Sequence, residues 1–186
     1  KTQIFFKRTQ SQFINMRLFI FFASLLLLCN ASYAQSPYTS YEDSTHKGTI
    51  ILNGLISKYI LINNDKDFKW YNNSHNGYSA TPNVLNAMEA AKGKYQFVLF
   101  GGTWCEDTQF ILPKFFKLQE QSGIADKDIS FIGVSREKKS LGNLTSAFNI
   151  INVPTIIVMK ECKEVGRVVE YGKTGQWDKE LAGLLQ

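Results

Sequence analysis

Continuous apolar runs alternate with helical patterns along the second half of the chain, and this order most constrains the fold. Residues 95–100 and 129–134 are nearly continuous apolar runs, as expected for strands buried on both faces. The predicted elements, in order, are strand 95–100, helix 105–121, strand 129–134, helix 141–148, strands 155–159 and 165–171 joined by a polar turn at 160–164, and a last helix capped by Thr174. This βαβαββα order predicts an α/β protein whose central mixed sheet has a parallel core and an antiparallel edge.

The first half of the chain carries weaker signals. We interpret residues 35–94 as an N-terminal extension that packs on the core. Its expected features are a flexible polar stretch at 35–47, a strand or a helix at 49–63, a short helix at 65–71, a loop at 72–77 where Asn, Ser, His and Gly cluster, and a helix opened by Thr81 and Pro82.

The first 34 residues are predicted to be a signal peptide. Basic residues precede an apolar run of 12 residues at 18–29, which is too short to span a bilayer comfortably. Small residues at Ser32 and Ala34 favour cleavage after Ala34, and Met16 is the better start of such a signal. We therefore expect export to a periplasmic or secreted location, with no stable membrane insertion after cleavage. An uncleaved membrane anchor is the alternative.

Charge gives no evidence for nucleic acid as a partner. The full chain has 21 basic and 16 acidic residues, for a net charge of +5. The predicted leader holds four of the basic residues and no acidic one, so the remaining chain has 17 basic against 16 acidic residues, a net charge of +1. The basic character of the sequence therefore comes mostly from the leader.

One cysteine stands where chemistry is expected, at the junction between the strand at 95–100 and the helix that follows. Cys105 lies at the start of that helix, where the dipole and free backbone amides stabilise a thiolate. The Thr108 hydroxyl and amide are candidate donors to the sulfur, whereas the charges of Glu106 and Asp107 oppose a second anion. Both a reactive thiol and an inert cysteine fit this pattern.

Four local features make residues 95–186 resemble the thioredoxin-like family. They are Trp104-Cys105 directly after a buried strand, Pro113 eight residues beyond the cysteine, Val153-Pro154-Thr155, and Gly172 after the last strand. The stretch around Cys105 is similar to exported members with a Trp-Cys-x-Asp-Ser/Thr site. The resemblance implies a thioredoxin-like fold, a cis proline at Pro154 that faces the active site, and a partner segment that pairs beside it. It implies catalytic roles for Cys105 and Thr108, and substrate binding by Trp104, Val153 and Pro154.

Two departures from a true thioredoxin narrow the expected activity. Thr108 stands in place of the resolving cysteine, and Leu99 stands in place of the family's buried acid. We therefore expect a monothiol oxidoreductase that forms mixed disulfides with protein or small-molecule thiols and disulfides. The alternative is a binding module that uses the same scaffold without turnover. The partner, the direction of electron flow and the oligomeric state stay open.

The remaining reactive side chains predict no second site. Cys162 lies in the expected turn at the far end of the strand that follows Pro154, about 26 Å away at 3.3 Å per residue, too far for a disulfide with Cys105. His46 and His75 are lone histidines in polar stretches, and no Cys/His spacing is typical of zinc. No metal and no cofactor are expected.

Overall fold

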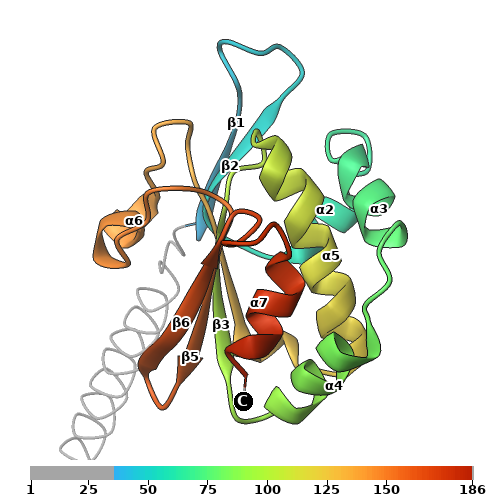
Figure 1. Ribbon diagram of the computed structural model, residues 1–186. Helices are drawn as coiled ribbons and strands as arrows, with labels where there is room; N and C mark the ends of the chain where they lie inside the picture. Colours follow the sequence, from blue (N-terminus) through green and yellow to red (C-terminus); the bar gives the residue numbers. More distant parts are fainter. Residues whose placement is uncertain (1–35, 186) are drawn as a thin grey trace, which may run out of the picture. The chain divides into compact units, whose positions relative to one another are not determined.

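The computed structural model describes residues 36–185, and residues 37–185 belong to one compact unit. The predicted signal peptide, residues 1–34, lies outside the described residues. The described chain is a mixed α/β structure, which confirms the predicted class, and its strands form one six-stranded sheet (Figure 1). The strands, in sheet order, are β1 (Tyr38–Glu42), β2 (Ile50–Ile56), β4 (Ile129–Gly133), β3 (Gln96–Gly101), β5 (Thr155–Lys160) and β6 (Lys163–Val169). Only β3 and β4 pair in parallel; the other neighbours are antiparallel.

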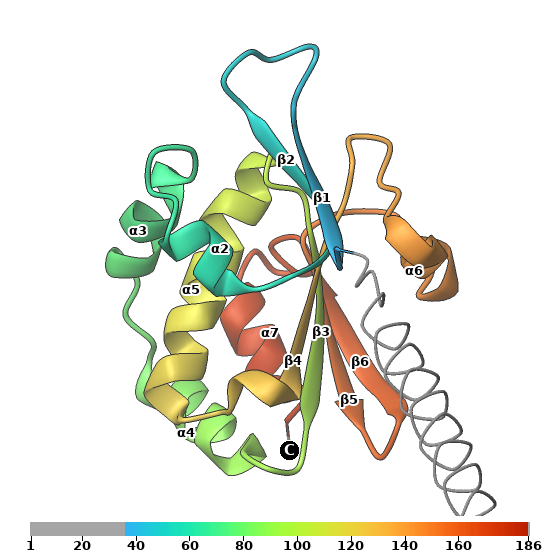
Figure 2. The same ribbon diagram turned by 180° about the vertical axis from the view of Figure 1, so that it is seen from behind.

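The helices lie unequally on the two faces of this sheet. They are α2 (Lys58–Ile62), α3 (Lys69–Asn76), α4 (Pro82–Ala91), α5 (Glu106–Ser122), α6 (Leu144–Ala147) and α7 (Trp177–Gly183), with 3-10 turns at Asp126–Asp128 and Leu141–Asn143. Figures 1 and 2 show α2 to α5 and α7 on one side of the sheet and α6 on the other. The order β3-α5-β4-α6-β5-β6-α7 is the one that the apolar pattern predicts.

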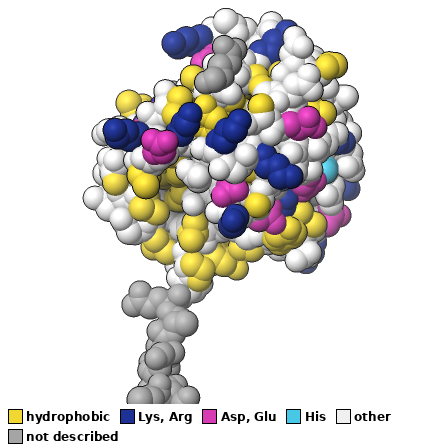
Figure 3. All heavy atoms as spheres, turned by 90° about the horizontal axis from the view of Figure 1, so that it is seen from below, with side chains coloured by type: hydrophobic (Ala, Val, Ile, Leu, Met, Phe, Trp, Pro, Cys, Tyr) yellow, Lys and Arg dark blue, Asp and Glu magenta, His cyan; other side chains and the backbone are white. Residues whose placement is uncertain are grey.

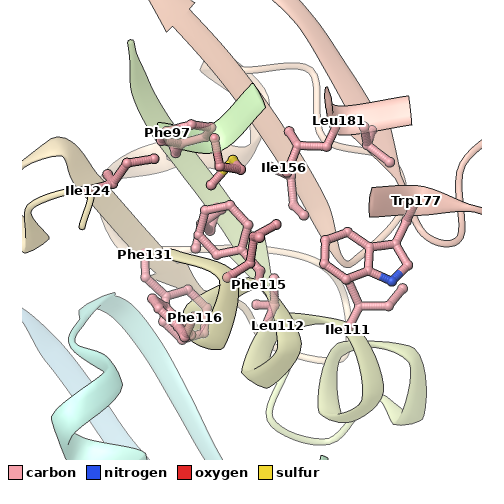
Figure 4. Close-up of a cluster of buried hydrophobic side chains, with 14 of the residues drawn as sticks. Phe97, Ile111, Leu112, Phe115, Phe116, Ile124, Phe131, Ile156, Trp177 and Leu181 are labelled. Atoms are coloured by element: carbon pink, nitrogen blue, oxygen red, sulfur yellow. The ribbon is translucent and has the colours of Figure 1, made fainter. Parts of the chain in front are cut away.

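The main core lies between the sheet and α5. The helix presents Ile111, Leu112 and Phe115 to the sheet, and the Phe115 ring meets Phe97 of β3 edge-on at 5.5 Å (Figure 4). Trp177 and Leu181 of α7 close the same cluster. A second, smaller cluster covers the opposite face, with members Phe100, Ile132, Val134, Val153 and Ile157. β3 contributes to both clusters, which explains why its sequence is a continuous apolar run.

In the first half of the chain, two predictions are wrong, and the structure decides a third that the sequence left open. The stretch expected to be flexible contains β1, which pairs along its whole length with β2. The expected loop at 72–77 belongs largely to α3, and the helix begins at Lys69 rather than at residue 65. Tertiary packing overrides composition there: Tyr71 is buried, and His75 stacks on its ring and bonds Glu120 of α5 at 2.9 Å. The undecided stretch at 49–63 is a strand followed by a short helix, β2 and α2.

Three boundaries in the second half also need correction. The predicted turn at 160–164 is only two residues long, Glu161 and Cys162, both with positive φ as a tight hairpin requires. The helix expected at 141–148 is interrupted, because Gly142 and Asn143 adopt left-handed backbone conformations. The last helix is capped by Gln176 rather than by Thr174.

Charged side chains of both signs are interspersed on the face of the molecule seen from below in Figure 3. Within residues 36–185, none of the helices combines the length and the apolar character that crossing a bilayer needs.

Candidate active site

The turn between β3 and α5 is built by close packing that only glycine permits. A Cβ atom on Gly101 would lie 2.7 Å from the Leu112 side chain, and one on Gly102 would lie 2.5 Å from the Trp104 ring. The Cys105 amide then donates to the Gly102 carbonyl at 2.9 Å, which closes the turn. The chain is thereby directed into α5 with Trp104 and Cys105 at its entrance.

Cys105 occupies the N-cap of α5, the position the sequence predicts. Glu106 and Asp107 follow in the first turn, where acidic side chains complement the helix dipole. Cys105 is partly buried, and its thiol lies 3.4 Å from the backbone carbonyl oxygen of Val153. The peptide bond between Val153 and Pro154 is cis, as the resemblance implies. The structure thus brings together Cys105, Val153 and Pro154, which are 48 and 49 positions apart in sequence.

Thr108 lies one turn along the helix but does not make the contact expected of it. Its side chain is fully buried, and its hydroxyl oxygen accepts a hydrogen bond from the Gly102 amide at 3.2 Å. No hydrogen bond joins this hydroxyl to Cys105 in the described part of the chain. Thr108 therefore stabilises the turn that presents the cysteine, and the expectation that its hydroxyl donates to the sulfur is wrong for this structure.

Trp104 is partly buried and packs against the same apolar cluster as Cys105. Its indole N–H donates to the Val134 carbonyl at 3.0 Å, and the Arg136 guanidinium lies over the ring, 5.1 Å from its centroid. Arg136 is in turn paired with Asp43, a buried carboxylate in the loop between β1 and β2. Sequence reasoning missed both Asp43 and Arg136, because neither lies in a motif and they are 93 positions apart.

Tyr171 is a further residue near the site that sequence reasoning missed. It follows β6, where the Glu170 amide donates to the Pro154 carbonyl at 2.7 Å. Burial and a hydrogen bond to Asp107 raise the pKa of Tyr171, and the nearby Cys105 and Glu106 act in the same direction. The Tyr171 ring also packs against Phe110 of α5 at 5.8 Å. An aromatic residue at the end of the predicted strand 165–171 was the only signal available in the sequence, and the structure ends β6 earlier, at Val169.

The other candidate groups lie away from this cluster. Cys105 and Cys162 are both free thiols. Cys162 is exposed in the turn between β5 and β6, and the six-residue strand β5, about 20 Å long, separates that turn from Pro154. His75 pairs with Glu120 near the opposite end of α5 from Cys105. Among residues 36–185, no group of three or more His, Cys, Asp or Glu side chains is arranged to hold a metal ion.

Comparisons with known proteins give a distant similarity. No family model matches the chain. A protein from Acanthamoeba polyphaga mimivirus named as thioredoxin-like is 29% identical over 76 residues, which are 41% of this chain and 53% of that protein. The match therefore spans about half the length of this relative.

Two solved structures align with the chain at low identity. They are an HIV epitope-scaffold, 16% identical with a TM-score of 0.43, and a protein of unknown function from Pseudomonas aeruginosa, 17% identical with a TM-score of 0.43. Each comparison covers 71% of this chain and 84% of the other. The chain is thus a mixed α/β protein with distant sequence similarity to a protein named as thioredoxin-like.

Proposed function

We propose that this protein is an exported thioredoxin-like protein that uses Cys105 as a single active-site thiol to form mixed disulfides. The observation that carries the proposal is the Cys105 thiol at the N-terminus of α5, 3.4 Å from the carbonyl of Val153 and beside the cis peptide bond to Pro154. A helix N-terminus favours the thiolate, which is the reactive form. The backbone of Val153 and Pro154 offers a partner segment an edge next to the sulfur.

The chemistry is one thiol–disulfide exchange. The Cys105 thiolate attacks one sulfur of a partner disulfide, so that a Cys105–partner S–S bond forms while the partner's own S–S bond breaks. The second partner sulfur leaves as a thiolate and takes a proton from solvent. Thr108 occupies the position from which a second cysteine would attack the new bond, and Cys162 lies too far away. A thiol from outside the chain is therefore needed to release the mixed disulfide.

The same proposal assigns roles to the rest of the chain. Residues 95–186 form the thioredoxin-like domain, and residues 35–94 form an extension that packs on it. Support for the extension comes from β2, which pairs with β4, and from α3 and α4, which contact α5. Residues 1–34 are the signal peptide that directs export.

A binding module without turnover is the second candidate. Two observations favour it: Cys105 is partly buried, and the Thr108 hydroxyl bonds Gly102 instead of the sulfur. In that case, Trp104 and Pro154 contact a partner without any covalent step.

Adduct formation with glutathione disulfide separates the two candidates. We expect intact mass spectrometry to show one glutathione on Cys105, stable until an external thiol such as dithiothreitol is added. Cys162→Ser should retain this adduct and Cys105→Ser should lose it. A folded wild-type protein that leaves Cys105 unmodified under conditions that modify Cys162 would reject the redox function and favour the binding module.

A further inference from the structure

We propose that Asp43 and Arg136 are positioning residues: through them, the hairpin of β1 and β2 fixes Trp104 and so governs how large disulfide partners approach Cys105. This inference rests on the proposed function and gives the N-terminal hairpin a role in the site. Neither residue is in contact with the sulfur. Their effect is carried by a chain of contacts that runs from Asp43 to Arg136 and on to Trp104.

The first link is a buried carboxylate in the hairpin loop. Only 3% of the Asp43 side chain is exposed, and Oδ1 accepts from both the amide and the hydroxyl of Thr45, at 2.9 and 2.7 Å. The remaining oxygen, Oδ2, accepts from Nε of Arg136. The Asp43 amide also donates to Thr49 at 2.8 Å, which closes the loop behind it. The carboxylate is therefore held in one place and can fix its arginine partner.

The second link is Arg136, in the loop that follows β4. Its Nε is held by Asp43 and its Nη2 lies 2.9 Å from Nδ1 of His46, so two residues of the hairpin loop orient the guanidinium. The guanidinium carbon lies over the Trp104 ring, 5.1 Å from the ring centroid. A cation over an aromatic face is attracted by the ring, and arginine makes this contact more often than lysine.

The third link is Trp104 itself, which is contacted from three directions. The indole N–H bonds Val134, Arg136 covers the ring, and the backbone of Gly102 lies directly against it. The preceding residue is also tied to the hairpin, because the Thr103 hydroxyl donates to Ile50 at 2.6 Å and accepts from Leu52 at 3.2 Å. The positions of Thr103 and Trp104, the two residues before Cys105, are thus held by β2 and by the loop between β1 and β2.

The fixed position of Trp104 should affect the reaction of Cys105 with large disulfides more than its reaction with small ones. A protein or peptide disulfide brings backbone and side chains that must rest on the wall beside the sulfur, which Trp104 forms. A small disulfide such as glutathione disulfide reaches Cys105 with much less contact. Because the buried carboxylate of Asp43 pairs with Arg136, the wall presents an indole covered by a paired guanidinium rather than by an isolated cation. Loosening the wall should therefore slow large partners selectively.

The test compares two disulfides on variants of the full chain. Asp43→Ala and Arg136→Leu should lower the rate of adduct formation with insulin about threefold to tenfold, the range expected from losing one cation–π contact. The rate with glutathione disulfide should change less than about twofold. Arg136→Lys keeps the charge beside Asp43 but removes the guanidinium from the Trp104 ring. Its rate with insulin should lie between the rates of Arg136→Leu and wild type.

Matched controls and a spectroscopic readout separate positioning from folding. Glu164→Ala and Arg167→Leu each remove one member of an arginine–carboxylate pair within β6 and should leave both rates unchanged. The fluorescence of Trp104 is obtained by subtracting the signal of the same variants carrying Trp104→Phe. Iodide should quench this fluorescence more strongly in Asp43→Ala than in wild type.

The outcomes for the two proposals are distinguishable. A folded wild type that forms no Cys105 adduct with either disulfide would overturn the proposed function and this inference with it. The inference alone would be overturned by a different result. In that case the wild type reacts with both disulfides, Asp43→Ala and Arg136→Lys fold, and neither variant changes the insulin rate or the quenching of Trp104. Should Asp43→Ala fail to fold, Arg136→Lys decides the question.

Discussion

The thiol of Cys105 lies 3.4 Å from the backbone carbonyl oxygen of Val153, although α5, β4 and α6 separate the two residues in sequence. β3 delivers Cys105 to one end of the sheet, and β5 starts beside Val153 at the same end because the two strands pair antiparallel. The topology of the sheet therefore places the sulfur against the cis peptide bond between Val153 and Pro154.

Replacing Thr108 with cysteine should create a reducible pair. Cys105 is the N-cap of α5 and Thr108 lies three residues further, and side chains at these two positions approach each other in capping motifs. Thr108→Cys should form a disulfide with Cys105 and should reduce insulin faster than wild type, because the second thiol now releases the mixed disulfide. Intact mass and peptide mapping measure the bond.

Thr108→Ser is the control for this change. It keeps a hydroxyl for the Gly102 amide but supplies no thiol, so its reductase activity should equal that of wild type.

Thr108→Cys should also be less stable than wild type. Loss of the hydrogen bond from the Gly102 amide in this variant should lower the free energy of unfolding by about 1 kcal/mol. If folded Thr108→Cys never forms the bond to Cys105, the assignment of this helix start as an active site is wrong.

Removing the charge of Asp43 should destabilise the protein in a pH-dependent way. Burial opposes ionisation of Asp43, but hydrogen bonds from Thr45 and the Arg136 guanidinium outweigh it and hold the pKa of this carboxyl far below its usual range. A lowered pKa in the folded state contributes stability above the unfolded value of about 3.9, and this stability is lost as pH falls further. Asp43→Asn should therefore unfold at lower urea concentration than wild type at pH 7.

The difference between the two proteins should shrink once the pH falls below about 4, where the unfolded carboxyl becomes protonated. Glu89→Gln, which removes a charge from an exposed position of α4, should show no comparable pH-dependent difference. A constant gap between wild type and Asp43→Asn from pH 7 to pH 3 would show that the Asp43 charge does not stabilise the fold.

Adding one methyl group at Gly102 should disturb the site more than the same change elsewhere. A Cβ atom there would lie 2.5 Å from the Trp104 ring, so the indole must move. Gly102→Ala should lower the free energy of unfolding by about 1–3 kcal/mol, the usual cost of overpacking, and should alter Trp104 fluorescence. Gly183→Ala is the matched control, because its Cβ atom would meet open space at the end of α7. Equal effects of the two substitutions in urea unfolding would contradict the packing argument.

Sequence patterns predict the parts of this fold that depend on local signals. The apolar runs predict β3, β4 and β5, and the turn before Cys105 predicts where α5 starts. The cis peptide bond at Pro154 follows from the resemblance and is present. These features are set by residues close together in sequence, and so they can be recognised without knowing how the sheet is assembled.

The missed features all depend on contacts between distant segments. β1 is polar and becomes a strand only because β2 offers it hydrogen-bonding partners. Asp43 and Arg136 meet because β2 and β4 are neighbours, and Tyr171 reaches Asp107 because β6 ends beside the start of α5. No spacing rule in the sequence connects these pairs, so the wall around Cys105 could not be predicted from motifs.

The most direct test of the central claim compares the two cysteines within one molecule. Cys162 is exposed and Cys105 is partly buried, so accessibility alone favours Cys162. If the start of α5 activates Cys105, limiting 2,2′-dithiodipyridine at pH 7 should modify Cys105 faster than Cys162 in the folded protein, and the preference should disappear in urea. Peptide mapping by mass spectrometry gives both rates from one sample. Faster modification of Cys162 in the folded state, with the same ratio in urea, would contradict an activated thiol at Cys105.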